Sequence, residues 1–151
     1  MTGWRLGYNI APPALTQAML QISQQFSRSA ATFTQFAGVA ALNGPQDEVD
    51  NMVKIYARRR DLVSHGFSKI DGLNFSPPEG TFFFFLNIKS FGMSSQSICS
   101  HLMEQAHVVS IPGCFYGSAG EGYIRMSFAY NEEMLRNGVD AIVAGLKTIN
   151  R

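Results

Sequence analysis

Two arginines have sequence surroundings that suit the binding of an anion. Arg5 lies between Gly3 and Gly7 in residues 3–8, where these residues alternate with large apolar ones. The alternation predicts a strand, on whose glycine face no side chain would shield the guanidinium or the backbone. Several fixed N–H donors suit a phosphate group. A tight packing site with Arg5 in a salt bridge explains the pattern equally well, and spacing alone does not choose between them.

Arg125 is the second such residue and lies in a predicted strand, residues 123–130, between Ile124 and Met126. A guanidinium with apolar neighbours is costly unless an anion meets it, and its planar fork matches a carboxylate in two parallel hydrogen bonds. The alternative is an internal salt bridge to Asp or Glu, which the pattern alone slightly favours. Residues 112–122, just upstream, contain four glycines and indicate a flexible mouth for a ligand.

Other signatures of catalysis are not found in the sequence. It has no CxxC, HExxH, GxGxxG or GxSxG motif. His65, His101 and His107 are scattered, without a carboxylate or cysteine at metal-ligand spacing, so no metal site is expected. The basic run from Arg58 to Arg60 is most simply a solvated helix face.

Composition narrows the class of protein. The 151 residues are 46% hydrophobic and 15% charged, which excludes an intrinsically disordered chain. A net charge of +1 gives no field that would recruit nucleic acid or an acidic membrane, so neither is expected as a partner. The longest strongly apolar run is residues 82–86, too short for a membrane span, and the N-terminus is not a signal peptide. Two cysteines fit a reducing cytosol, and we expect a cytoplasmic protein.

The elements that must position the two arginines follow from apolar periodicity and turn residues. Pro12 and Pro13 suit the first turn of a helix that continues through Leu15 to Phe26. A second helix carries residues 33–40, and Asn43-Gly44-Pro45 stops it. An apolar stripe predicts one long helix over residues 46–70, a natural bridge between two structural units. Residues 1–44 and 45–151 are therefore the expected domains, with the boundary at Gly44–Pro45 or within the long helix.

The second part of the chain has the pattern of a small α/β unit. Residues 82–88 are apolar on both faces, which predicts a strand inside a sheet. A helix over residues 94–106, a short strand over residues 107–111 and the strand over residues 123–130 follow. Asn131 is placed to cap the last helix.

Five stretches together resemble the C-terminal part of fold-type-I, pyridoxal-phosphate-dependent aminotransferases of classes I and II. They occur in the family's order and extend over the whole chain: Met1-Thr2-Gly3-Trp4-Arg5-Leu6-Gly7-Tyr8, Gln35-Phe36-Ala37 with Ala41-Leu42, Tyr56-Ala57-Arg58-Arg59-Arg60-Asp61, Pro78-Glu79-Gly80-Thr81-Phe82-Phe83, and Pro112-Gly113 through Gly120-Glu121-Gly122-Tyr123-Ile124-Arg125. Two departures are small. Tyr116 stands where the family usually has Phe, and Phe83 where Tyr is common.

The resemblance implies a fold and a chemistry. The fold would be α/β, the C-terminal portion of the pyridoxal-phosphate-dependent transferase fold: the end of the large domain with a strand and two helices, a bridging helix, and a small α+β domain with a mostly antiparallel sheet. Arg5 would hold the phosphate of pyridoxal 5'-phosphate and Arg125 the substrate α-carboxylate. The parent protein, expected to be a homodimer, would move an amino group from an amino acid to a 2-oxo acid.

The same resemblance implies that no catalytic residue lies in this chain. The Schiff-base lysine of the family would fall just upstream of Met1, and transamination needs such a lysine to anchor the cofactor and shuttle a proton. The chain alone is therefore expected to be inactive and to self-associate through faces that would otherwise meet an upstream sheet. A carbon–sulfur lyase or decarboxylase of the same fold type is an alternative parent. A stand-alone small-molecule-binding or interaction module over residues 46–151 is a further one.

Overall fold

The computed structural model describes residues 2–27 and 29–149, and the chain divides into two compact units, Met1–Glu48 and Val49–Arg151. The division is geometric. The assignment of residues 1–44 to a large cofactor-binding domain and of residues 45–151 to a small domain stays a prediction. Each unit is described by itself.

The first unit contains the two expected helices, α1 (Pro13–Phe26) and α2 (Thr32–Asn43). The ring of Pro13 occupies the first position of α1, where the missing N–H leaves no helical hydrogen bond unmade. Residues before α1 pack across α2: Leu6 fills the space beside Gly38, and the rings of Trp4 and Phe33 lie 6.3 Å apart. Helix α1, in contrast, contributes no buried residue.

The strand expected over residues 3–8 is not present. Thr2–Trp4 form one 3-10 turn (η1), Arg5 has a left-handed φ of 53°, and residues 6–12 have no regular structure. A strand is stabilised by ladder hydrogen bonds to a neighbouring strand, and the described part of this unit offers none. The side chains of residues 3–8 do alternate, but the prediction that these residues form a strand is wrong.

Helix α3 (Asp47–Phe67) confirms the long helix and extends about 30 Å at 1.5 Å per residue. Its apolar stripe is buried only toward the C-terminal end, where Val63 and Phe67 join the core. Val49, Met52 and Val53, in the first two turns, are all about half exposed. The core of the second unit therefore covers only the C-terminal part of this apolar stripe.

The second unit has a three-stranded antiparallel sheet of order β1-β3-β2, formed by β1 (Phe83–Asn87), β3 (Tyr123–Ser127) and β2 (Ile111–Pro112). The prediction that residues 82–88 lie inside the sheet is wrong, since β1 is an edge strand; beyond it only Asn74 and Asn87 form a bridge. The expected strand over residues 107–111 is also wrong for its first four residues. His107 instead has a left-handed φ of 55° and ends the helix before it, so the chain reaches β3 only at Ile111.

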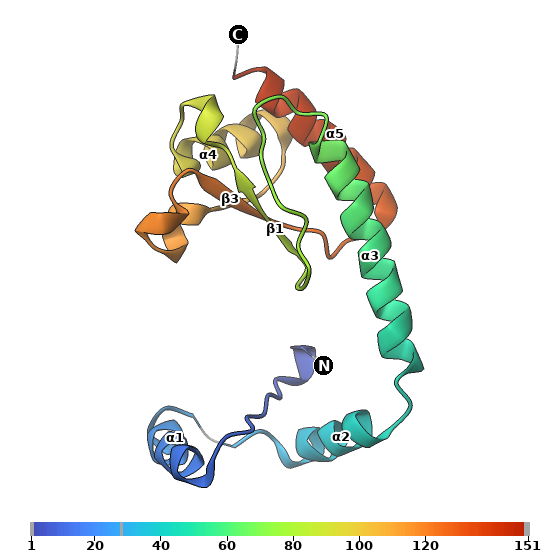
Figure 1. The fold of residues 1–151 in the computed structure, drawn as a ribbon, viewed down its shortest axis with the longest axis vertical. Helices are drawn as coiled ribbons and strands as arrows, with labels where there is room; N and C mark the ends of the chain where they lie inside the picture. The colour runs from blue at the N-terminus through green and yellow to red at the C-terminus, as the bar shows by residue number, and fades with distance from the viewer. Residues whose placement is uncertain (1, 28, 150–151) are drawn as a thin grey trace. The chain divides into compact units, whose positions relative to one another are not determined.

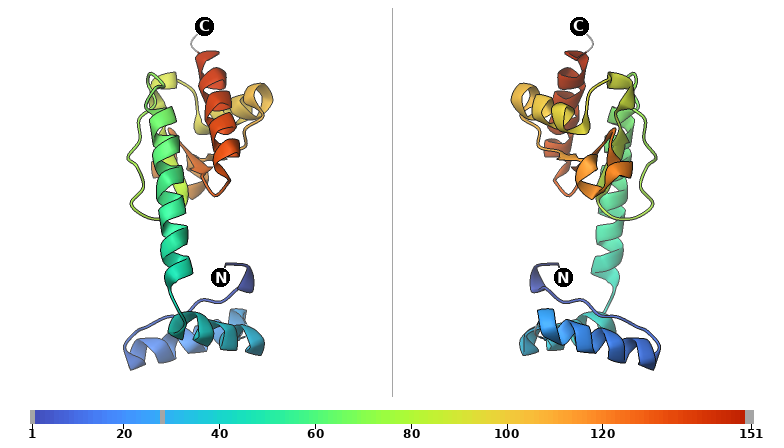
Figure 2. Two further views of the ribbon diagram at one scale, coloured as in Figure 1. Left: turned by 90° about the vertical axis from the view of Figure 1, so that its right-hand side faces the viewer. Right: turned by 90° about the vertical axis from the view of Figure 1, so that its left-hand side faces the viewer.

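Helices α4 (Ser95–Ala106) and α5 (Glu132–Lys147) confirm the two remaining helical predictions, and short 3-10 turns form at Lys89–Phe91, Gly113–Tyr116 and Ser118–Gly120. The side chain of Asn131 accepts a hydrogen bond from the Met134 N–H at 2.8 Å and caps α5 as expected. Helices α3 and α5 run side by side (Figures 1 and 2). Gly66 of α3 has no Cβ and so leaves room for the Val139 side chain of α5.

The core of this unit fills the space between the helices and one face of the sheet. Its most deeply buried apolar side chains come from all of these elements: Phe67, Phe84, Leu86, Ile88, Ile98, Leu102, Ile124 and Leu146. Four aromatic rings, of Phe67, Phe75, Phe84 and Phe128, meet edge to face within it. Among the described residues, no helix combines the length and apolar character that a membrane crossing requires.

Candidate functional site

Arg125 lies at the middle of the sheet face that points away from the core. On central strand β3 it is paired with Phe85 of β1 on one side and with Ile111 of β2 on the other. Paired residues of an antiparallel sheet project to the same face, so these three side chains form one row across it. Ile124, the neighbour in sequence, projects into the core and is fully buried. The strand therefore presents Arg125 on its open face.

Two aromatic rings flank the Arg125 guanidinium. Its central carbon lies 4.2 Å from the ring centroid of Phe83 and 5.1 Å from that of Tyr116. Phe83 begins the edge strand, whereas Tyr116 ends the 3-10 turn of the loop that precedes β3. Both distances are within the range of a cation–π interaction, which holds the guanidinium without using its N–H groups.

Further rings continue this open face beyond Arg125. Phe85 meets Tyr116 edge-on at 6.5 Å and stacks on Tyr123 at 4.9 Å with nearly parallel planes. The Lys89 ammonium lies 5.1 Å from the ring centroid of Tyr123. A hollow of about 430 Å³ adjoins these rings, lined by Asn74, Phe75, Ser76, Pro78, Phe83, Phe85, Asn87 and Tyr123. The face thus combines aromatic surface with two cations.

The salt-bridge alternative for Arg125 is not what the structure shows. Among the described residues no carboxylate lies within 4.0 Å of its guanidinium; the ion pairs present are Arg58–Glu132 at 3.7 Å and Arg60–Asp61 at 2.8 Å. The apolar neighbours of Arg125 in sequence also do not enclose it. The side chain is half-buried, because Ile124 and Met126 point to the opposite face of the sheet. Its N–H donors face the open side and lack a described protein acceptor.

Two of the four glycines of residues 112–122, Gly113 and Gly120, allow close packing of the loop backbone. A Cβ on Gly113 would collide with the carbonyl oxygens of Gly120 and Tyr123, and a Cβ on Gly120 would collide with the Gly113 backbone. Gly117 has a φ of 108°, which residues with a Cβ rarely adopt. The loop is therefore folded back on itself in two short turns, and Tyr116 is held at a defined place beside Arg125.

Glu121 fastens the end of this loop to helix α4, a contact that our sequence analysis did not foresee. One carboxylate oxygen accepts from the Ser95 backbone N–H and the other from the Ser95 hydroxyl, each at 2.8 Å. Ser95 is the first residue of α4, where N–H groups lack helical partners and the helix dipole favours negative charge. The backbone bond, and then the hydroxyl bond, lower the pKa of Glu121 below its usual value. In the sequence, the only feature that pointed to Glu121 was its position in the family-like stretch that ends at Arg125.

Arg5, in the first unit, is exposed and has open space on either side. A Cβ added at Gly3 or at Gly7 would meet no atom within 4 Å, so these glycines do not serve tight packing in the described chain. No described carboxylate forms an ion pair with Arg5. The residue therefore offers an unpaired cation beside accessible backbone, which are the features that a phosphate group requires.

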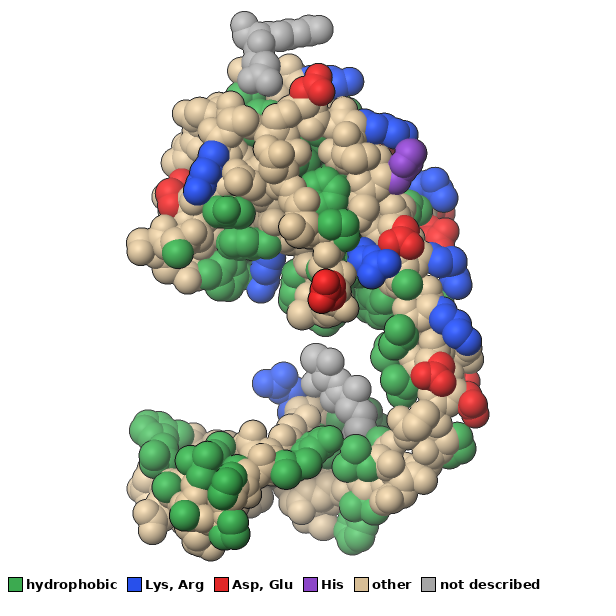
Figure 3. Space-filling view, viewed as in Figure 1, with side chains coloured by type: hydrophobic (Ala, Val, Ile, Leu, Met, Phe, Trp, Pro, Cys, Tyr) green, Lys and Arg blue, Asp and Glu red, His purple; other side chains and the backbone are tan. Residues whose placement is uncertain are grey.

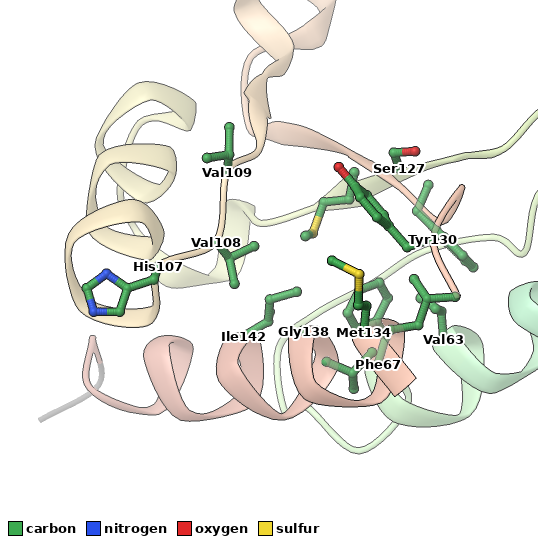
Figure 4. Close-up of a pocket in the computed structure, with 14 residues that line it drawn as sticks. Val63, Phe67, His107, Val108, Val109, Ser127, Tyr130, Met134, Gly138 and Ile142 are labelled. Atoms are coloured by element: carbon green, nitrogen blue, oxygen red, sulfur yellow. The ribbon is translucent and has the colours of Figure 1, made fainter. Parts of the chain in front are cut away.

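A separate apolar pocket of about 340 Å³ lies on the core side of the sheet (Figure 4). Residues 107–109 border one end of it, Val63 and Tyr130 the other, and α5 runs along it. Neither Arg5 nor Arg125 lines this pocket, and its walls are largely aliphatic. Its polar side chains, His107, Ser127 and Tyr130, are spread along the pocket, and none of the four lysines or the two candidate arginines lines it.

Other reactive side chains are not arranged for catalysis in the described part of the chain. Burial raises the pKa of the Cys99 thiol, whose sulfur accepts a hydrogen bond from the Ser110 hydroxyl at 3.1 Å. Such a thiol is a poor nucleophile. All four lysines lie on the surface, as expected: Lys54, Lys69, Lys89 and Lys147. The described residues contain no group of three or more His, Cys, Asp or Glu able to hold a metal ion.

Comparison with known proteins gives matches along nearly the whole chain. Residues 1–142 match the family described as aminotransferase class I and II. The aspartate aminotransferase of Pyrococcus horikoshii is 37% identical over 149 residues, which cover 97% of this chain and 38% of that protein. Aromatic-amino-acid aminotransferase 2 of Thermococcus litoralis is 36% identical with the same coverage. The crystal structure of an aromatic aminotransferase from Pyrococcus horikoshii superposes with a TM-score of 0.89 at 34% identity, covering 98% of this chain and 40% of that one.

Proposed function

Because this chain belongs to the class I and II aminotransferase family, we propose that the whole protein moves an amino group from an amino acid to a 2-oxo acid with pyridoxal 5'-phosphate. The chain spans about 38% of the length of the two relatives described above. Its fold is that of the corresponding part of the family's structures. Relatives of nearly equal identity carry the names of aspartate and of aromatic amino acids, so similarity alone does not select the substrate.

The observation that carries this proposal is the unpaired guanidinium of Arg125 on the open sheet face. A substrate α-carboxylate is common to every amino acid and 2-oxo acid, and a bidentate pair with Arg125 would orient it. The nearby rings of Phe83 and Tyr116 lower the local exposure of the guanidinium to water, which strengthens such a pair. We therefore assign Arg125 the role of binding the substrate carboxylate.

Arg5 and its open surroundings fit the phosphate of the cofactor. The exposed guanidinium and the free space beside Gly3 and Gly7 let a phosphate reach both the side chain and the backbone. When bound, pyridoxal phosphate supplies an electron sink that stabilises negative charge at the amino-acid Cα. Arg5 itself would hold the phosphate in place and neutralise part of its charge.

The remaining parts of the proposal concern the whole protein. We expect a cytoplasmic homodimer, with residues 1–44 forming the end of its large domain. The 151-residue chain by itself would be inactive, since its four lysines are all exposed and none lies in a motif that could replace the Schiff-base lysine. The apolar faces of α1 and α2, described below, are consistent with packing against further protein.

Transamination by the product of the native gene tests the proposed function. With pyridoxal phosphate, an amino acid and 2-oxoglutarate, we expect a new 2-oxo acid and glutamate in equal amounts. Arg125→Ala should lower kcat/KM by at least about 30-fold, the equivalent of ~2 kcal/mol for a lost charged pair. Arg136→Ala, which removes an exposed arginine of α5, is the control and should be close to wild type. Release of sulfide or carbon dioxide in place of amino transfer would instead indicate a lyase or a decarboxylase.

A further inference from the structure

We propose that Phe83 and Tyr116 act as positioning residues, which clamp the Arg125 guanidinium by two ring contacts and fix the direction in which it presents its N–H groups. The inference rests on the proposed carboxylate role of Arg125. It adds that carboxylate binding depends on two aromatic side chains that need not touch the carboxylate themselves.

The two rings restrict the conformational freedom of the Arg125 side chain. A free arginine side chain loses up to about 2 kcal/mol of rotamer entropy when it is ordered. The Arg125 guanidinium forms no hydrogen bond or ion pair with any described residue, so no polar contact orders the side chain. The side chain is ordered by the rings of Phe83 and Tyr116, whose centroids lie 4.2 Å and 5.1 Å from the guanidinium carbon. A guanidinium held by ring contacts leaves its N–H donors without a protein acceptor and available for an anion.

Both rings are themselves held in place. Phe83 lies in the paired part of β1 and packs against Phe82, with ring centroids 4.4 Å apart. Tyr116 ends a loop whose backbone is packed through Gly113 and Gly120, and whose far end Glu121 fastens to α4. The two sides of the clamp thus come from separate, independently fixed segments.

Two measurements on the native gene product test the clamp. Rings above and below a guanidinium displace the resonance of its Nε–H group, so the Arg125 signal, identified by its loss in Arg125→Lys, reports the clamp directly. Titration with maleate, a rigid dicarboxylate, reports carboxylate binding. The variants are Phe83→Leu and Tyr116→Leu, which remove a ring, and Phe83→Tyr and Tyr116→Phe, which keep it. Phe115→Leu, beside Tyr116 but with no ring contact to Arg125 among the described residues, is the matched control.

We expect each Leu variant to move the Arg125 signal toward that of a free arginine and to weaken maleate binding about fivefold. The ring-keeping variants and the control should stay within about twofold of wild type. In an Arg125→Lys background, Tyr116→Leu should cause no further loss, because an ammonium has no faces to clamp. Leu variants with an unmoved Arg125 signal, or with unchanged affinity while Arg125→Lys binds weakly, would overturn the clamp. Unchanged affinity in Arg125→Lys itself would instead overturn the carboxylate role.

Discussion

Glu121 and Ser95, 26 residues apart in sequence, are joined by two hydrogen bonds that use both oxygens of one carboxylate. Glu121 directly precedes Gly122 and strand β3, and Ser95 starts helix α4. The contact therefore fixes the end of the loop that carries Tyr116 and the start of the strand that carries Arg125. Glu121 thus helps to fix the two segments that carry Tyr116 and Arg125.

This contact predicts a loss of stability in acid. The Ser95 donors lower the folded-state pKa of Glu121 below its unfolded value, so the carboxylate stabilises the fold above the unfolded pKa. That contribution disappears as the pH falls through the folded pKa. We expect Glu121→Gln to lower the urea midpoint at about pH 7 and to lower it less at about pH 3, which is below the ordinary glutamate value of ~4.3.

Glu104→Gln provides the control for this measurement, since Glu104 is an exposed carboxylate of α4 that forms no ion pair with the described residues. Its urea midpoint should follow that of wild type at each pH. If Glu121→Gln were equally destabilising at both pH values, the charge of Glu121 would not be the source of its effect.

Loss of Arg5 should loosen the cofactor and leave the fold intact. The residue is exposed, and no described carboxylate pairs with it, so Arg5→Ala removes no protein contact of measurable strength. In the native gene product we expect pyridoxal phosphate to dissociate at least about tenfold faster during dialysis, as a charge-assisted bond to phosphate is lost. The thermal midpoint of the cofactor-free protein should not change. A variant that unfolds yet holds its cofactor normally would show that Arg5 is structural.

The 151-residue chain expressed by itself should self-associate through its first unit. Side chains such as Ile22 and Phe36, exposed to 62% and 72%, give α1 and α2 extensive apolar surface (Figure 3). Large apolar patches rarely persist on monomers. We expect oligomers in light scattering, and faster amide exchange in α1, which has no buried residue, than in the core helices α4 and α5.

Charge substitution locates the self-associating surface. Ile22→Glu combined with Phe36→Glu should shift the chain toward monomer, because carboxylates cannot be buried unpaired in an apolar contact. Met103→Glu, at a 51% exposed position of α4, should leave the oligomers intact. Oligomers that survive the first change and dissolve with the second would place the contact on the second unit.

Helix positions and caps were largely determined by the sequence alone. Pro13 at the start of α1, Gly44 after α2 and Asn131 before α5 act through their own backbone and nearest neighbours. The alternation along residues 123–127 likewise placed Ile124 in the core and Arg125 on the opposite face. Such local rules need no knowledge of what the element packs against, and the predictions that depended on them were confirmed.

Strand pairing and the surroundings of Arg125 were decided only by the tertiary structure. Residues 3–8 alternate as a strand does, yet they form none in this chain, because a strand needs a partner that local sequence does not supply. The apolar run at residues 82–88 could not reveal that β1 lies at an edge. The rings of Phe83 and Tyr116 reach one guanidinium from segments 33 residues apart, and Ser95 meets Glu121 across 26. These contacts arise from the register of β1 on β3 and the closing of the glycine loop, which are properties of the folded chain and of no single segment.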